Sequence, residues 1–144
     1  MGIQIDWLDK DAGIGLWRFD GLWTWDEFNT QAARAMSEAE ALPYRVDLVV
    51  DVSMNLLPPF GFIHNFRSGA VIPRAKNHGI SVIVGGRMVE MILRLLFHIN
   101  PALEKVNFFA PSLEEALLII HTHRAQSTQQ APTAKDIPAA PPTV

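Results

Sequence analysis

The stretch GISVIVGGRMVEMILRLLFHI, residues 79–99, decides how this chain folds. It begins with a short apolar run, Ile80–Val84, which is typical of a buried β-strand. Two glycines then break the strand, and Arg87–Ile99 follows with the length and apolar content of a helix, which an Asn-Pro pair ends. The stretch therefore predicts a strand followed by a helix, the repeating unit of an α/β protein.

The same alternation continues on both sides of this stretch. We expect four further strands, at residues 3–8, 14–19, 47–52 and 105–110. We expect three further helices, at about residues 24–39, 60–74 and 112–124. Thr24 with Glu27, and Ser112 with Glu115, have the spacing of capping boxes at two of the helix starts.

The connections between these elements indicate the direction of the strands. Asp9–Gly13 (DKDAG) is a short turn, so the first two strands form an antiparallel hairpin. The later strands are separated by segments long enough to hold a helix, which suits parallel crossovers. The predicted fold is α/β, a mixed sheet of about five strands in the order β-β-α-β-α-β-α-β-α with helices packed on it. We expect one domain, residues 1–124, and a disordered Pro/Ala-rich tail, residues 125–144.

Composition excludes several classes of protein. The 144 residues are 49% apolar, carry a formal net charge of −3 and include no cysteine, which excludes disulfides and a thiol nucleophile. That charge does not suit a nucleic-acid binder, and no segment predicts a transmembrane helix or a signal peptide. The histidines lack metal-ligand spacing, and Asp51 has no partner base. We therefore expect a cytoplasmic, non-enzymatic protein without a cofactor.

Four segments, in order, carry a resemblance to a known family: GLWTWDEF (21–28), DLVVDVS (47–53), GISVIVGG (79–86) and PSLEEAL (111–117). Over residues 3–123 the chain resembles the STAS domain, the SpoIIAA-like fold of bacterial anti-anti-sigma factors, and within it the STAS/SEC14-like branch. The resemblance implies a bacterial regulatory module that acts through protein–protein contacts.

The resemblance does not extend to the phosphorylation switch of that family. Phosphorylatable members carry an Asp-Ser-Ser-Gly turn after the third strand. Here Gly61 keeps the glycine position, but Pro59 and Phe60 stand at the two serine positions and carry no hydroxyl. Ser53 lies nearby at the strand end, where we do not expect the switch.

The helix predicted at residues 87–99 is more apolar than one buried face requires, with nine apolar residues among 88–99. Neighbouring helices could cover the surplus. A homodimer interface is an alternative, with candidate residues Met88, Met91, Ile92, Leu95 and Leu96. A third reading is an apolar pocket of about 300 Å³ or more, as in a carrier or sensor of a lipid-like ligand. Its candidate residues are Trp23, Trp25, Phe60, Phe62 and Phe66.

Charge adds two weaker signals. Residues 1–40 carry eight acids against three bases, whereas residues 60–103 carry five bases against one acid. This asymmetry suits either a solvated surface or a contact with an acidic partner or a second copy. Arg87 follows the two glycines and is a candidate anion contact, although a simple tight turn explains the glycines equally. We therefore predict a homodimeric STAS-like interaction module, which could also contact another cytoplasmic protein, with the apolar-ligand carrier as the alternative.

Overall fold

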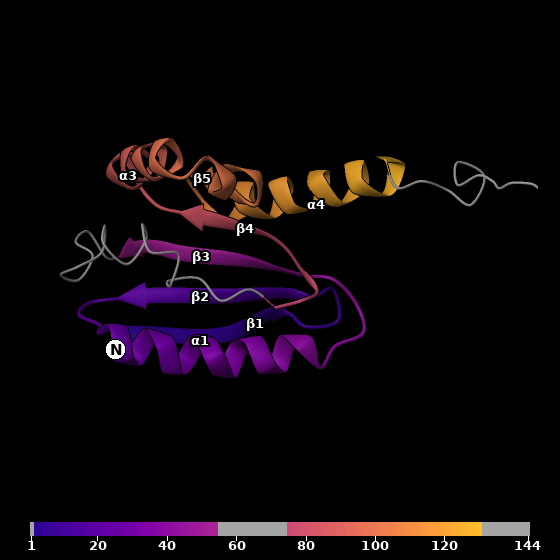
Figure 1. Cartoon of the computed structure of the whole chain (residues 1–144), viewed down its shortest axis with the longest axis horizontal. Coiled ribbons are helices and arrows are strands. Elements are labelled where there is room, and N and C mark those ends of the chain that lie inside the picture. The colour runs from indigo at the N-terminus through magenta and orange to yellow at the C-terminus, as the bar shows by residue number, and fades with distance from the viewer. Residues whose placement is uncertain (1, 55–74, 131–144) are drawn as a thin grey trace, which may run out of the picture.

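The computed structural model describes residues 2–54 and 75–130, and Figure 1 shows the arrangement of their elements. In these ranges the chain forms five strands, three α-helices and a short 3-10 helix. The elements follow in the order β1 (Gly2–Asp9), β2 (Ile14–Asp20), α1 (Trp25–Glu40), β3 (Val46–Met54), β4 (His78–Val84), α3 (Arg87–Ile99), η1 (Pro101–Lys105), β5 (Asn107–Ala110) and α4 (Leu113–Gln130).

The five strands form one mixed sheet in the order β1-β2-β3-β4-β5. β1 and β2 pair antiparallel, with Ile5 opposite Trp17, and every other pair of neighbours is parallel. The predicted mixed α/β sheet and its antiparallel hairpin are confirmed. Gly13 closes the hairpin with a φ of 71°, a conformation that favours glycine, and its N–H donates to the Lys10 carbonyl.

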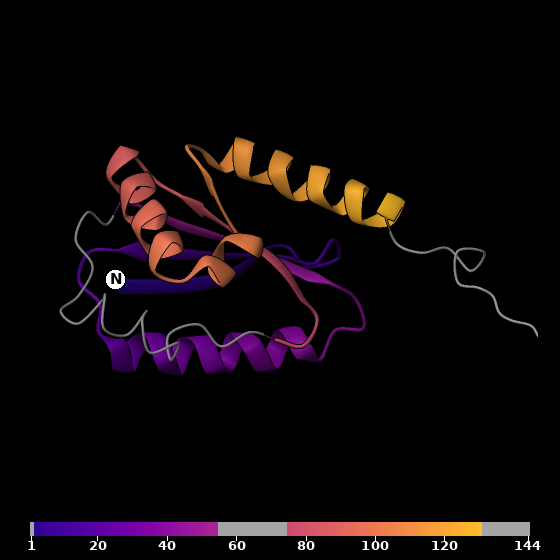
Figure 2. The same cartoon turned by 45° about the horizontal axis from the view of Figure 1, so that its top comes forward.

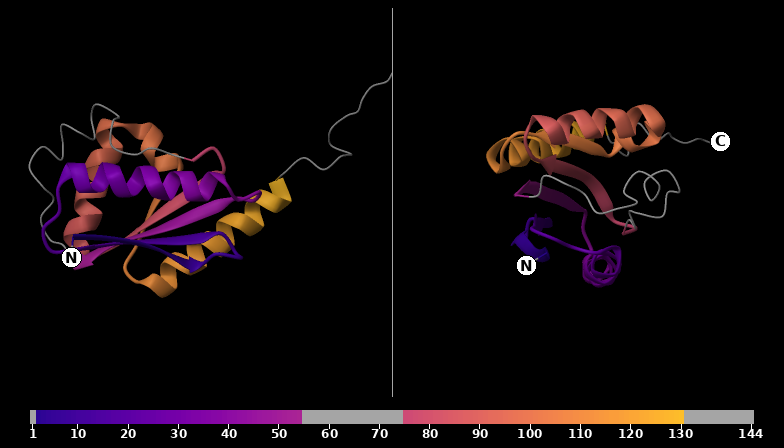
Figure 3. Two further views of the ribbon diagram at one scale, coloured as in Figure 1. Left: turned by 90° about the horizontal axis from the view of Figure 1, so that it is seen from below. Right: turned by 90° about the vertical axis from the view of Figure 1, so that its left-hand side faces the viewer.

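The helices divide between the two faces of the sheet. α4 packs on one face, where Ala116 and Ile120 join Val49, Ile80 and Val82 in a buried cluster. α1 packs on the other face, where Phe28 and Ala32 meet residues of β1 and β2. α3 covers the same face as α1 at the β4–β5 side, and the views in Figures 2 and 3 show α1 and α4 on opposite sides. Alternate residues along each strand therefore belong to two different cores.

Two capping interactions fix the starts of α1 and α4. The Thr24 hydroxyl accepts a hydrogen bond from the Glu27 N–H (3.1 Å), and the Ser112 hydroxyl accepts one from the Glu115 N–H (3.2 Å). The Glu27 carboxylate does not return to Thr24 as a full capping box would. It accepts from the N–H of Ile3 (3.2 Å) and so joins α1 to the first strand.

The C-terminal half differs from the sequence prediction in two places. β5 begins at Asn107, because Pro101–Lys105 form η1 where its proline fits the first turn of a helix. α4 continues to Gln130, so residues 125–130 are helical and the predicted tail boundary at 125 is corrected. The sequence AQSTQQ contains neither glycine nor proline, so nothing in it stops the helix. The predicted helix at 60–74 and residues 131–144 lie outside the described residues.

Candidate functional site

A cavity of about 390 Å³ lies between α1 and α3 on the face of the sheet opposite α4. Its floor consists of alternate residues of β3, whose side chains all point to this face: Val46, Leu48, Val50 and Val52. The first and the last of these residues are six positions apart along the strand, so the floor is about 20 Å long. α1 contributes one side of the cavity through Ala35, Met36 and Ala39, and the cavity is therefore elongated along the central strand.

One end of the cavity has an aromatic wall, formed by Trp17, Phe19, Trp23, Trp25 and Phe28, which all line it. The Trp23 ring packs edge-on against Phe19 and against Trp25, with ring centroids 5.1 and 5.0 Å apart. Such T-shaped pairs are the favoured geometry for aromatic rings. The structure thus brings together two of the predicted pocket residues, Trp23 and Trp25. The other predicted pocket residues, Phe60, Phe62 and Phe66, lie outside the described residues.

α3 faces the cavity with five apolar side chains: Val89, Ile92, Leu93, Leu96 and Phe97. This corrects the sequence-based interface for two of its residues. Leu96 is only 2% exposed and Ile92 is half-buried, because both lie on the side of the helix that faces the sheet. These two residues line the cavity and do not belong to the outer surface of the helix.

The outer side of α3 carries a separate apolar surface, formed by Met88, Met91, Leu95 and Ile99; we call it the α3 stripe. Met88 is 56% exposed, Met91 64% and Leu95 50%. The four residues are spaced three and four apart, so they follow one face of the helix. Among the residues that the structure describes, this is the largest run of exposed apolar side chains on one helix.

Polar groups are few along the cavity. At the β4 end, the His78 Nε2 lies 2.9 Å from the Ser81 hydroxyl, and Asn107 donates to the Leu103 carbonyl. At the aromatic end, the indole Nε1 of Trp23 is buried and has no hydrogen-bond partner in the described part of the chain. A mainly apolar space with a few placed polar groups is the usual character of a small-molecule site.

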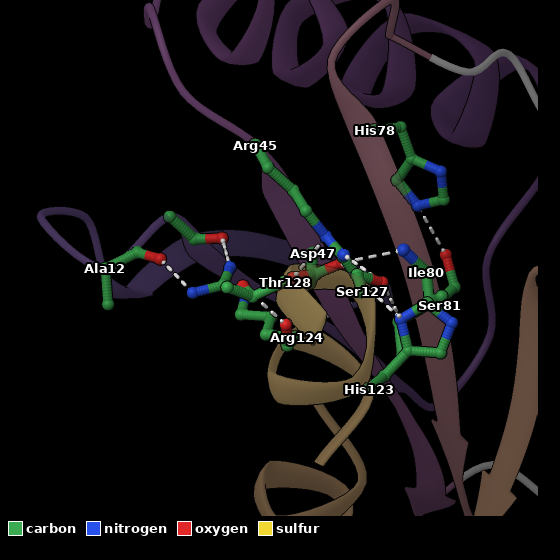
Figure 4. Close-up of polar contacts among 11 residues, drawn as sticks. Ala12, Arg45, Asp47, His78, Ile80, Ser81, His123, Arg124, Ser127 and Thr128 are labelled. Atoms are coloured by element: carbon green, nitrogen blue, oxygen red, sulfur yellow. Dashed lines mark hydrogen bonds and ion pairs between the residues drawn. The ribbon is translucent and has the colours of Figure 1, made fainter. Parts of the chain in front are cut away.

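A cluster of polar side chains lies elsewhere, on the α4 face, and surrounds the carboxylate of Asp47 (Figure 4). This side chain is fully buried. It accepts hydrogen bonds from the Arg45 Nε (2.9 Å), the Arg124 Nε (2.5 Å) and the backbone N–H of Ile80 (2.7 Å). We call Arg45, Asp47, His123 and Arg124 the Asp47 cluster.

The remaining contacts of the Asp47 cluster join α4 to the β1–β2 turn. The Arg124 guanidinium donates to the carbonyls of Ala12 (2.6 Å) and Gly13 (3.0 Å), and the Arg45 Nη2 lies 3.0 Å from the His123 Nδ1. The carboxylate is fully paired, and the cluster lies at the amino end of β3, whereas ligands of open α/β sheets bind beyond the carboxyl ends. We assign it a structural role. The sequence does not reveal this cluster, because Arg124 meets Arg45 and Asp47 only in the fold.

The other sequence candidates lie apart from both sites. Asp51 pairs with Arg18 (3.7 Å) and accepts from the Ser53 hydroxyl (2.6 Å) at the carboxyl end of β3. Arg87 is exposed at the start of α3 and does not line the cavity. Within residues 2–54 and 75–130, no group of three histidine, aspartate or glutamate side chains is placed to hold a metal ion.

Comparison with known proteins identifies no relative: no family model, no curated protein and no solved structure matches this chain. The resemblance to the STAS domain therefore stays a prediction. None of the helices in the described ranges is both long and apolar enough to cross a membrane.

Proposed function

We propose that this protein binds a small apolar ligand in the cavity between α1 and α3, as a carrier or sensor. The single observation that carries the proposal is the cavity itself, with a floor of β3 side chains and an aromatic wall at one end. Its volume of about 390 Å³ falls in the range typical of ligand sites, about 300–1,000 Å³. The proposal concerns binding alone, and we propose no reaction.

A matched pair of α1 variants tests this proposal. Ala35 lines the cavity, whereas Ala33 is exposed on the outer side of the same helix. Ala35→Phe adds a ring to the cavity, so we expect it to lower the affinity for N-phenylnaphthylamine, a neutral apolar fluorophore, at least tenfold. Ala33→Phe adds the same ring to the surface and should leave that affinity unchanged. Equal affinities in the two variants, or no binding by the natural protein, would contradict the proposal.

A second candidate function, a homodimeric STAS-like interaction module, is favoured by the α3 stripe. An antiparallel, two-fold pairing of two α3 helices would place Met91 of one copy near Leu95 of the other, so the stripe is complementary to itself. Apolar side chains that are half exposed or more in the single chain would become buried in such a dimer. This candidate keeps the expectations of a cytoplasmic location, a regulatory role and no phosphorylation switch, all of which rest on the sequence.

Two leucine-to-glutamate variants test the dimer. Leu95→Glu places a charge in the α3 stripe, whereas Leu118→Glu places one at a similarly exposed leucine of α4. We expect light scattering to give a dimer for the natural protein and for Leu118→Glu, and a folded monomer for Leu95→Glu, since an unpaired interfacial charge is costly. A natural protein that is monomeric at all accessible concentrations would exclude this second candidate.

A further inference from the structure

The Trp23 indole indicates what kind of apolar molecule the cavity holds, an inference that rests on the proposed function. Its Nε1–H is buried at the aromatic end and meets no acceptor among the described residues. A buried donor without a partner is uncommon in proteins, because it has lost its hydrogen bonds to water without replacement. The neighbouring side chains, Phe19, Trp25 and Phe28, are aromatic and offer no oxygen acceptor. A ligand oxygen would supply the missing acceptor, and the surrounding rings must move apart to admit it, because Nε1 is buried in this structure.

The charges around the cavity limit what that oxygen belongs to. Arg34 is the one arginine or lysine among the described lining residues. Its guanidinium already donates to the Gln31 side chain (3.0 Å) and lies 3.8 Å from the Glu38 carboxylate. The other charged lining residues, Asp6 and Glu38, are acidic. At the aromatic end, the described residues therefore offer a carboxylate or phosphate no lysine or arginine that lacks a partner, and desolvation of such an anion is very unfavourable.

We propose that the ligand is a neutral, elongated amphiphile, such as a fatty ester or ketone, whose oxygen accepts a hydrogen bond from the Trp23 Nε1–H. Its alkyl chain lies along the β3 floor, between α1 and the inner side of α3. The floor of about 20 Å suits a chain and not a compact ring system. The indole N–H then selects the end of the ligand that carries the oxygen. The described lining residues include no unpartnered arginine or lysine, which disfavours anionic analogues of the ligand.

Three probes of equal chain length test this inference: methyl laurate, laurate and dodecane. For the natural protein we expect calorimetric or fluorophore-displacement affinities about tenfold higher for methyl laurate than for dodecane, the effect of one net hydrogen bond. Laurate should bind at least tenfold more weakly than its ester. Tighter binding of laurate than of the ester would overturn the neutral-ligand assignment.

Trp23→Phe removes the N–H and keeps an aromatic ring. We expect this variant to bind methyl laurate and dodecane with affinities within about twofold of one another. The comparison variant Trp25→Phe also alters the aromatic wall, so both affinities should change alike, but it retains the Trp23 N–H and should keep the tenfold ratio in favour of the ester. A tenfold preference that persists in Trp23→Phe overturns the inference but leaves the proposed function standing. No binding of any probe by the natural protein overturns both.

A measurement on the natural protein tests the same hydrogen bond and does not require that Trp23→Phe folds. In a nitrogen–proton correlation spectrum, the Trp23 indole N–H resonance should move downfield when methyl laurate is added, because it becomes hydrogen-bonded. Dodecane should not produce this downfield shift. The same shift with both ligands, or with neither, would contradict a hydrogen bond between Trp23 and the ligand.

Discussion

The buried carboxylate of Asp47 connects distant elements of this fold. Its carboxylate lies fully buried between two arginines and the Ile80 N–H, and through Arg124 it joins β3 to the last helix, 77 residues away. A buried carboxylate is tolerated only when it is paired, and removal of its charge leaves two guanidinium groups without their partner. From the sequence, Asp47 is predicted only as the polar first residue of a buried strand. Nothing in a single sequence indicates a pair so far apart.

The first prediction concerns this carboxylate. Asp47→Asn should lower the free energy of unfolding by about 3 kcal/mol, since it breaks a buried ion pair. For a domain of this size the thermal midpoint should fall by roughly 10 °C. The control is Asp51→Asn, the same change at a partly exposed carboxylate that lies 3.7 Å from Arg18; it should cost under about 1 kcal/mol. Similar losses in the two variants would show that the Asp47 cluster contributes nothing special.

Gly79 provides a steric test of the same cluster. A methyl group at this position would overlap the Arg45 guanidinium and the Asp47 carboxylate. We expect Gly79→Ala to lower the thermal midpoint by roughly as much as Asp47→Asn, because it displaces the same two side chains. Gly86→Ser is the control: a side chain there meets nothing within 4 Å, and Gly86 is the N-cap of α3, where serine is favoured. Thermal melts of both variants measure the difference.

Among the elements, α3 was the hardest to interpret from sequence. Its bounds are as predicted, Arg87–Ile99, because a Gly-Gly pair precedes it and Asn-Pro follows it. Which residues are buried was not predictable, since nine apolar residues in one short helix leave no clear polar face. The structure separates an inner side, which lines the cavity, from the α3 stripe. The homodimer interface predicted from the sequence therefore included Leu96, which is buried in the structure.

Adjacent leucines of α3 test that division. Leu96 is 2% exposed and Leu95 is 50% exposed, so the same substitution has different consequences at the two positions. Leu96→Glu should unfold the protein or reduce its stability by several kcal/mol, since it buries an unpaired charge. Leu95→Glu should stay folded, within about 1 kcal/mol of the natural protein when both are compared as monomers. Circular dichroism melts measure the stability of the two variants. An unfolded Leu95→Glu would contradict the assignment of Leu95 to the outer side of α3.

For the whole molecule, the sequence predicts the α/β architecture, but it does not decide whether a cavity exists. Strand and helix alternation, with one tight hairpin, is enough to derive a mixed sheet, because connection length limits strand direction. The cavity depends on how far apart α1 and α3 pack over β3, a distance that no local pattern contains. Trp23 and Trp25 could be proposed as pocket residues from the sequence, because residues 7–25 hold all four tryptophans of the chain, which is a dense group of aromatic side chains. The orphaned Trp23 N–H became visible only with the neighbouring rings in place.

Native mass spectrometry of freshly purified, untagged protein tests the central claim most directly. The account predicts a protein mass increased by a few hundred daltons, with the excess lost on denaturation and recovered by extraction as a neutral amphiphile. The same spectrum gives the number of subunits, so it also reports on the α3 stripe. A bare chain, which neither carries such a molecule nor takes up methyl laurate when it is supplied, would contradict the account. The space between α1 and α3 would then be a gap in packing and not a binding site.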